Sequence, residues 1–141
     1  MSFSETIAPL LGRCALVWFY VTGTLNLFHN WTGVAEQLTA RHVPVPPLVL
    51  VIALLLVTMG CFSLLFGYHV RHGAVILFGL TISGAVLLHD YWHYSDQAAR
   101  NVQFEIFSRD LAIAGGLLLL MGMGGGPFAI DNKGAGGKPK R

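Results

Sequence analysis

A segment in the second half of the chain, residues 88–93 (Leu-His-Asp-Tyr-Trp-His), places two histidines and a carboxylate at the end of an otherwise uncharged apolar stretch. Ionisable groups are costly in a hydrocarbon environment, so those found there usually have partners or a function. Imidazole and carboxylate groups together could hold a metal ion or face the polar head of a quinone. Which chemistry applies depends on the elements that position these side chains.

Metal binding is the first chemistry to consider. His89 and His93 would share one face of a helix at a spacing of i, i+4, and His29 could add a third nitrogen. The chain has neither an HExxH nor a CxxCH motif. We therefore predict no metal site, and favour a structural or quinone-facing role for the histidines.

The composition indicates which environment surrounds these groups. Of the 141 residues, 54% are apolar and 11% are charged, and the mean hydropathy is +0.61. A soluble domain averages about 25% charged residues, so this chain is predicted to be an integral membrane protein with the lipid bilayer as its main partner. The formal net charge of +2 and the lack of a basic helix argue against nucleic acid as a partner.

Four apolar segments are predicted to cross the membrane as helices, since a span needs roughly 20 mostly apolar residues. They cover residues 9–30, 47–68, 72–93 and 104–123. The expected fold class is all-α, an integral membrane four-helix bundle within residues 1–126. Val34, Leu38 and Arg41 stand at helical spacing and predict a short interfacial helix between the first two spans. Residues 127–141 are predicted to form a flexible, basic cytoplasmic tail.

Lysine and arginine are distributed unevenly between the two sides. Four spans put both termini on one side, which carries six of the nine basic residues: Arg13, Arg71, Lys133, Lys138, Lys140 and Arg141. The opposite side carries Arg41, Arg100 and Arg109. By the positive-inside rule, both termini are predicted to be cytoplasmic.

In this topology, polar side chains from three helices meet in the outer leaflet. The first and third spans end there and the fourth begins there, which gives the candidate cofactor-binding cluster His29, His89, Asp90, Arg109 and Asp110. An unpaired guanidinium inside a membrane helix is costly, so Arg109 is predicted to pair with Asp90 or Asp110. The cluster also fits an ordinary aromatic belt with polar neighbours. A structural ion-pair network and a functional pocket are both open at this point.

Two stretches carry a resemblance to a known family. Residues 89–92 (His-Asp-Tyr-Trp) and 103–118 (Gln-Phe-Glu-Ile-Phe-Ser-Arg-Asp-Leu-Ala-Ile-Ala-Gly-Gly-Leu-Leu) resemble the DoxX family of small bacterial membrane proteins. Arg109 and Asp110 stand where that family usually has Lys and Asn. The resemblance implies a four-helix bundle in the bacterial cytoplasmic (inner) membrane, and a link to quinone-dependent sulfur oxidation or redox-stress complexes.

Two functions of different class follow as expectations. The first is an accessory subunit packed against a larger membrane redox or energy-transducing complex, because the chain has no flavin, haem or Fe–S motif and would need other membrane-protein subunits to move electrons. Two small-residue pairs, Gly79/Ser83 and Ala112/Gly116, would allow close helix approach within the bundle or against such a partner. The alternative is a quinone-linked membrane oxidoreductase component that uses the outer polar cluster, with quinone as its cofactor.

Overall fold

The computed structural model describes residues 2–131, which form an all-helical membrane protein and confirm the predicted fold class. The elements in chain order are α1 (Phe3–Thr6), α2 (Ala8–His29), α3 (Trp31–Ala40), α4 (Pro46–Phe66), α5 (Val70–Leu88), the 3₁₀ turn η1 (Tyr91–His93) and α6 (Gln97–Met123). Four of them, α2, α4, α5 and α6, are long and apolar enough to cross a membrane. The 21 residues of α4 correspond to about 31 Å of helix, close to the thickness of the hydrocarbon layer.

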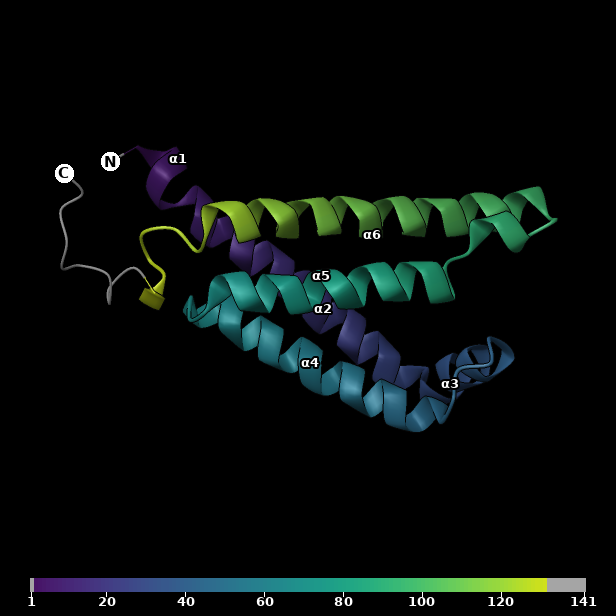
Figure 1. The fold of residues 1–141 in the computed structure, drawn as a ribbon. Coiled ribbons are helices and arrows are strands. Elements are labelled where there is room, and N and C mark those ends of the chain that lie inside the picture. Colours follow the sequence, from purple (N-terminus) through teal and green to yellow (C-terminus); the bar gives the residue numbers. More distant parts are fainter. Residues whose placement is uncertain (1, 132–141) are drawn as a thin grey trace.

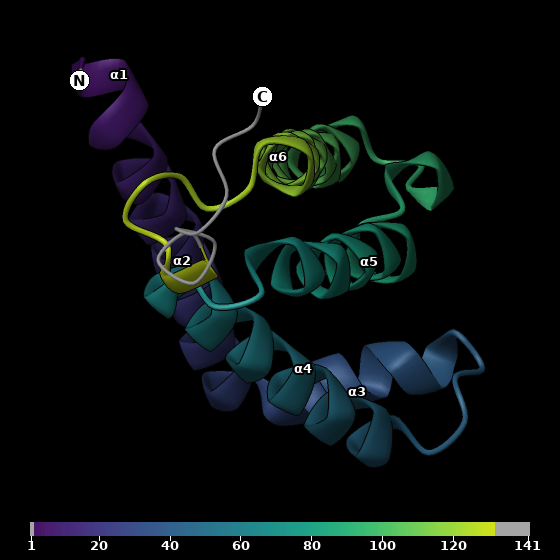
Figure 2. The same cartoon turned by 60° about the vertical axis from the view of Figure 1, so that its left-hand side comes forward.

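The four long helices run in alternating directions (Figure 1). The start of α1, the α4–α5 turn and the segment after α6 lie together at one end, here called the terminal end; α3 and η1 lie at the other, here called the α3 end. Helix α5 packs most extensively against α6 and α4, whereas α2 packs mainly against α4. As Figures 1 and 2 show, the α2/α4 pair diverges from the α5/α6 pair toward the α3 end.

The surface of the bundle is apolar and the core is small. Large apolar side chains such as Trp18, Leu55 and Leu119 are 71%, 62% and 67% exposed. The buried core is formed by Tyr20, Leu64, Ala74, Leu77 and Leu117. It lies toward the terminal end, since Leu64 is in the last turn of α4 and Ala74 is in the second turn of α5. A soluble monomer rarely exposes so large an apolar surface, whereas lipid covers it at no cost.

The close contact between α4 and α5 depends on two glycines. A Cβ atom on Gly60 would lie 2.6 Å from Leu77 Cγ, and one on Gly73 would lie 2.4 Å from Ser63 Oγ. Helices in lipid associate by such close backbone approach. The pair predicted at Gly79 does not serve this contact, because a Cβ atom there would meet nothing within 4 Å.

Helix ends follow local signals, and two differ from the sequence expectation. Helix α6 begins at Gln97 and not at residue 104, because the Asp96 carboxylate accepts a hydrogen bond from the backbone N–H of Ala99 at 3.0 Å and caps the helix. Helix α5 ends at Leu88 and not at residue 93. The prolines at 46 and 47 occupy the first turn of α4, as expected for residues without an N–H to satisfy.

The predicted interfacial helix is present as α3. Of the predicted flexible tail, residues 127–131 are described and pack on the terminal end, where Ala129 is buried. Residues 132–141, which include the basic part of that tail, lie outside the described residues.

Candidate functional site

Arginines at the terminal end bind the ends of helices. Arg13 is 2% exposed, and its Nη1 donates a hydrogen bond to the Leu64 carbonyl at 3.2 Å, in the last turn of α4. Arg71 is exposed, and its Nη2 donates to the Gly122 carbonyl at 3.4 Å, in the last turn of α6. The last carbonyls of a helix lack partners within it and carry partial negative charge. Both arginines therefore stabilise a helix C-terminus.

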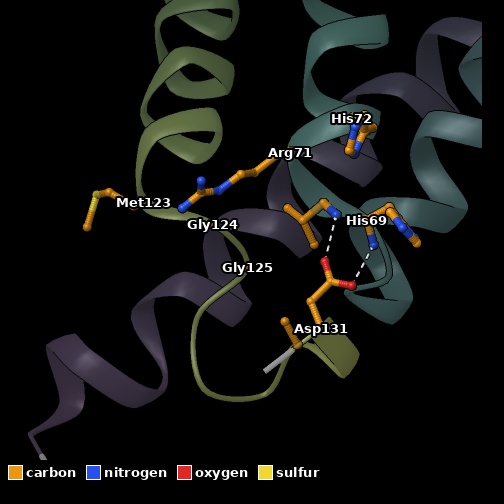
Figure 3. A pocket seen from close by; sticks show the side chains of 9 residues that line it. His69, Arg71, His72, Met123, Gly124, Gly125 and Asp131 are labelled. Carbon is orange, nitrogen blue, oxygen red and sulfur yellow. Dashed lines mark hydrogen bonds between the residues drawn. The ribbon is translucent and has the colours of Figure 1, made fainter. Parts of the chain in front are cut away.

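Asp131 completes this pattern at the start of α5 (Figure 3). Its two carboxylate oxygens accept hydrogen bonds from the backbone N–H groups of His69 and Val70 at 2.9 and 3.1 Å. The hydrogen bond from the His69 backbone, with that from Val70, holds the pKa of Asp131 below its usual value. A cavity of about 320 Å³ beside this contact is also lined by Arg71 and His72. The charged side chains Arg71 and Asp131 that line it bind backbone groups at helix ends. We therefore assign the charges of the terminal end a structural role.

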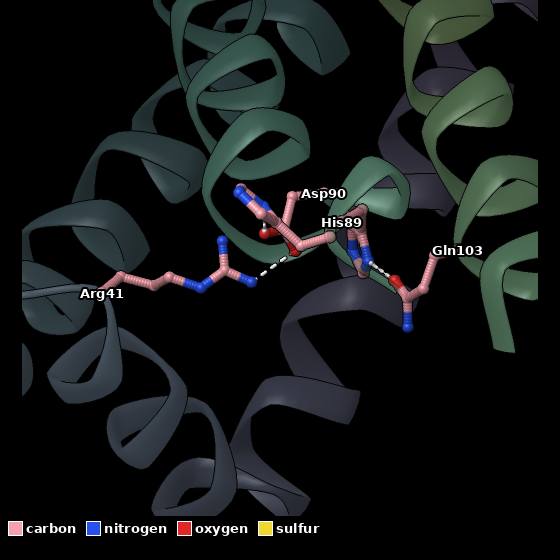
Figure 4. A network of polar contacts seen from close by, with 5 residues as sticks. Arg41, His89, Asp90 and Gln103 are labelled. Atoms are coloured by element: carbon pink, nitrogen blue, oxygen red, sulfur yellow. Dashed lines mark hydrogen bonds and ion pairs between the residues drawn. The ribbon is translucent and has the colours of Figure 1, made fainter. Parts of the chain in front are cut away.

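The α3 end contains a different arrangement, a buried carboxylate held by two cationic or hydrogen-bonding side chains (Figure 4). The Asp90 side chain is 3% exposed and forms an ion pair with Arg41, the residue that ends α3. Its second oxygen lies 2.6 Å from Nδ1 of His93. This three-residue clasp joins α3 to the α5–η1 connection. Of the two partners predicted for Arg109, Asp90 is paired with Arg41 instead, and Asp110 is the one that forms an ion pair with Arg109, at 3.5 Å.

The clasp also explains where α5 ends. Asp90 leaves helical geometry at φ −81° and ψ 72°, and Tyr91 turns back onto α6, with its ring centroid 5.1 Å from that of Phe104 and 5.5 Å from that of Phe107. His89 and His93 therefore do not share a helix face, as the sequence interpretation assumed. His89 instead lies against α6, with Nδ1 2.9 Å from Oε1 of Gln103.

A cavity of about 410 Å³ opens beside the clasp, between the diverging helix pairs; we call it the α3-end cavity. Its walls are mostly apolar and include Phe19, Leu27, Ala53, Val57, Leu80 and Leu88. Its polar lining includes Asn26, Gln37, Thr81, His89, Arg109 and Asp110. Ligand pockets commonly have this composition, with apolar walls and a few convergent polar groups.

The charged pair in this cavity is poorly matched. Asp110 is 8% exposed, and the one hydrogen bond to its carboxylate within the described residues is a long contact of 3.5 Å from Nη2 of Arg109. The Arg109 side chain is 58% exposed and its guanidinium carbon lies 5.2 Å from the centre of the Phe19 ring. Stacking on an aromatic face leaves the guanidinium N–H edges free for another acceptor.

The inner wall of the cavity is held by a satisfied hydrogen-bond chain. Thr81 Oγ1 donates to the Leu77 carbonyl at 2.7 Å, so its proton is used, and the Tyr20 hydroxyl donates to Thr81 at 2.5 Å. This chain fixes α2 against α5 at that level. The polar side chains Tyr20 and Thr81 of the cavity wall thus have close partners, whereas Asp110 in the same cavity has only a distant one.

The structure divides the five predicted cluster residues. His89, Arg109 and Asp110 line the α3-end cavity. Asp90 lies next to it but is used by the clasp. His29 is exposed and outside the cavity lining, and its Nδ1 bonds the carbonyl of Leu25 in its own helix at 2.8 Å.

Sequence reasoning missed the roles of Arg41, which follows α3 and forms the clasp, and of Gln37, an α3 residue that lines the cavity. It treated α3 as an interfacial segment, and no motif links it to the third span. Asn26, near the end of α2, is outside the predicted cluster and also lines the cavity.

The fold and the site define a small membrane protein of four spanning helices, with a mostly apolar cavity that contains a few polar side chains. The chain belongs to the SURF4 family, whose model matches residues 47–135. It is 31% identical over 127 residues to the inner membrane protein YqjF of Escherichia coli, covering 90% of this chain and 92% of that protein. It is 25% identical over 130 residues to the inner membrane protein YphA of the same organism, covering 92% of each. No solved structure matches the chain significantly.

These comparisons correct the family expectation. The resemblance to the DoxX family is wrong, because the matching family is SURF4. The links to sulfur oxidation and redox stress came from that resemblance alone, and they lose their support with it. The relatives support an inner-membrane location, as does the presence of four candidate spans.

Proposed function

We propose that this protein binds an amphiphilic ligand in the α3-end cavity, with the ligand's polar head at Arg109 and Asp110 and its apolar part along the walls. The observation that carries the proposal is the buried Asp110 carboxylate with one distant partner. A carboxylate removed from water costs several kcal/mol unless it is paired or hydrogen-bonded. A ligand that supplies the missing hydrogen bonds would recover that cost.

The apolar walls support a ligand that comes from the membrane. The apolar lining includes Phe19 and Leu27 of α2 and Leu80 and Leu88 of α5. These helices are two of the candidate spans, and the cavity lies where the helix pairs diverge. An apolar ligand tail would leave lipid and enter a similar environment, so binding needs no exposure of apolar surface to water.

Two glycines of α5 allow a direct test. Gly84 lines the cavity, and a Cβ atom there would meet nothing within 4 Å. Gly79, on the same helix, also has open space but does not line the cavity. Gly84→Leu should fill the cavity, whereas Gly79→Leu is the matched control.

The measurement is native mass spectrometry of the full-length protein, purified in mild detergent from its own membrane. We expect a retained amphiphile on wild type and on Gly79→Leu, and its loss from Gly84→Leu. Equal retention by all three proteins, or none by wild type, would contradict the proposal.

The quinone-linked role predicted from the sequence would use the same cavity, since quinone carbonyls could accept hydrogen bonds from Arg109. It requires that a short-chain quinone compete with the retained amphiphile.

The accessory-subunit role is a separate proposal, supported by open glycines such as Gly79 and Gly115 on outward faces. It requires co-purification of another membrane protein that Gly115→Leu removes.

The orientation predicted from Lys and Arg is part of this proposal. With cytoplasmic termini, the α3-end cavity lies in the outer leaflet. A cysteine at Ser95, between η1 and α6, should then react with an impermeant thiol reagent in intact spheroplasts, and a cysteine at Ser4 should not. The reverse pattern would place the cavity in the cytoplasmic leaflet.

A further inference from the structure

We propose that the head group bound in the α3-end cavity is zwitterionic, a phosphate linked to an ammonium group, carried by a phospholipid. This inference rests on the proposed function and names the class of its ligand. It starts from the charges of the cavity, which are one guanidinium and one carboxylate, Arg109 and Asp110.

The two charges do not satisfy each other. They are adjacent in sequence, and neighbouring side chains on a helix point in directions about 100° apart. Their single contact of 3.5 Å is at the limit of a hydrogen bond. Arg109 keeps most of its donors and Asp110 most of its acceptor sites, so both can bind a third group.

Each charge requires an opposite group on the ligand. Arg109 offers N–H donors in a planar fork, the geometry that fits a phosphate. Asp110 requires a donor, and an ammonium group supplies both the protons and the charge. An anionic lipid would satisfy Arg109 but place its negative charge near Asp110. A quinone offers only acceptors and would leave Asp110 without a partner.

The neutral side chains around the pair fit the same head group. With Gln103 Oε1 as acceptor, the His89 Nδ1 carries the proton, and Nε2 of the neutral ring keeps a lone pair for a donor such as ammonium. Asn26 of α2, which also lines the cavity, adds an amide that can donate to a phosphate oxygen. The apolar side chains that line the rest of the cavity favour a ligand with acyl chains over a free head group.

The test compares two short-chain lipids with identical acyl chains, dihexanoyl phosphatidylethanolamine and dihexanoyl phosphatidylglycerol. Both are titrated into the delipidated full-length protein in mild detergent, and binding is followed by native mass spectrometry. We expect phosphatidylethanolamine to bind about tenfold more tightly, the ratio that about 1.4 kcal/mol corresponds to. Free phosphoethanolamine should not bind at the concentration that saturates the lipid site.

Three variants separate the roles of the charges. Asp110→Asn should remove the preference by weakening phosphatidylethanolamine binding alone, and Arg109→Gln should weaken both lipids. Glu105→Gln, on the same helix but exposed and outside the cavity, is the control and should change neither. Two results would overturn the proposal that the cavity selects a zwitterionic head group. One is equal affinity of wild type for the two lipids, and the other is a preference for phosphatidylethanolamine that survives Asp110→Asn.

The outcomes also separate this inference from the proposed function. Equal binding of both lipids that Gly84→Leu abolishes would keep the cavity as an amphiphile site and overturn its zwitterionic selectivity. If neither lipid binds and wild type retains no amphiphile, both the proposed function and the zwitterionic selectivity are contradicted. Phosphoethanolamine that binds as tightly as the lipid would overturn the membrane as the ligand's source.

Discussion

The charged side chains at the two ends of the bundle differ in how well they are paired. At the terminal end, Arg13, Arg71 and Asp131 each bind backbone groups at a helix terminus. In the α3-end cavity, the one polar contact of Arg109 and Asp110 within the described residues is the 3.5 Å contact between them, and Arg109 also stacks on Phe19. A charge that satisfies a helix end contributes to the fold, whereas a buried charge without a close partner costs stability. This difference is the basis of our proposal that the α3 end is the part of this protein that binds a ligand.

The clasp lies between these two cases. Asp90 is as buried as Arg13, yet its partners are the side chains of Arg41 and His93. Its charge is satisfied, so we assign it to structure although it adjoins the cavity. Four substitutions test this division, and a fifth tests its consequence for the cavity.

The largest effect is expected at Arg13. Arg13→Ala removes a fully buried side chain and leaves the Leu64 carbonyl without its donor, so the free energy of unfolding should fall by about 2–4 kcal/mol. Arg71→Ala, at the same end but exposed, should cost no more than about 0.5 kcal/mol. Reversible unfolding in mixed micelles measures both. Equal losses from the two variants would show that burial of Arg13 is not what matters.

The next effect is expected in the clasp. Asp90→Asn keeps the shape of the side chain but leaves Arg41 without its counter-charge, and should cost about 1–3 kcal/mol. Because α3 is joined to the α5–η1 connection through Asp90, hydrogen exchange of α3 backbone amides should accelerate as well. Unchanged exchange in α3 would contradict the assignment of the clasp as its anchor.

A smaller effect is expected at Asp131. Asp131→Asn weakens the cap on the first N–H groups of α5 and should cost about 1 kcal/mol. The pKa of Asp131 is lowered in the folded protein, so its contribution is complete above the unfolded value near 4. It is lost as the pH falls through the lower folded value. The difference in melting temperature between wild type and Asp131→Asn should therefore shrink in acid; a constant difference would exclude the carboxylate as its cause.

Most of the fold could be predicted from the sequence, because the length of an apolar segment alone specifies a membrane helix. The predicted spans differ from the helices mainly where polar residues decide the end. The fourth span was predicted to begin at residue 104, yet Asp96 caps α6 well before it, and the two alanines at 98 and 99 were a signal for helix that could have been used.

The candidate site was predictable only in part. The end of the bundle at which it lies followed from the order of the spans, but side-chain direction did not, because the polar residues of α2 and α6 do not gather on one face of either helix. His29 therefore could not be distinguished from Asn26. Arg41 and Arg109 were both expected at the same end, so charge alone could not tell which one binds Asp90. That choice depends on where α3 packs, 49 residues away along the chain.

The thermal stability of Asp110→Asn, measured without ligand in mild detergent beside Asp131→Asn, tests the contrast between the two ends most directly. The amide has the shape of the carboxylate but no charge to desolvate, and Asp110 has only the distant Arg109 to lose. We expect its melting temperature to equal or exceed that of wild type, while Asp131→Asn melts about 2–5 °C lower. A fall for Asp110→Asn as large as that for Asp131→Asn would show that both carboxylates serve the fold, and would contradict the account of the cavity as a binding site.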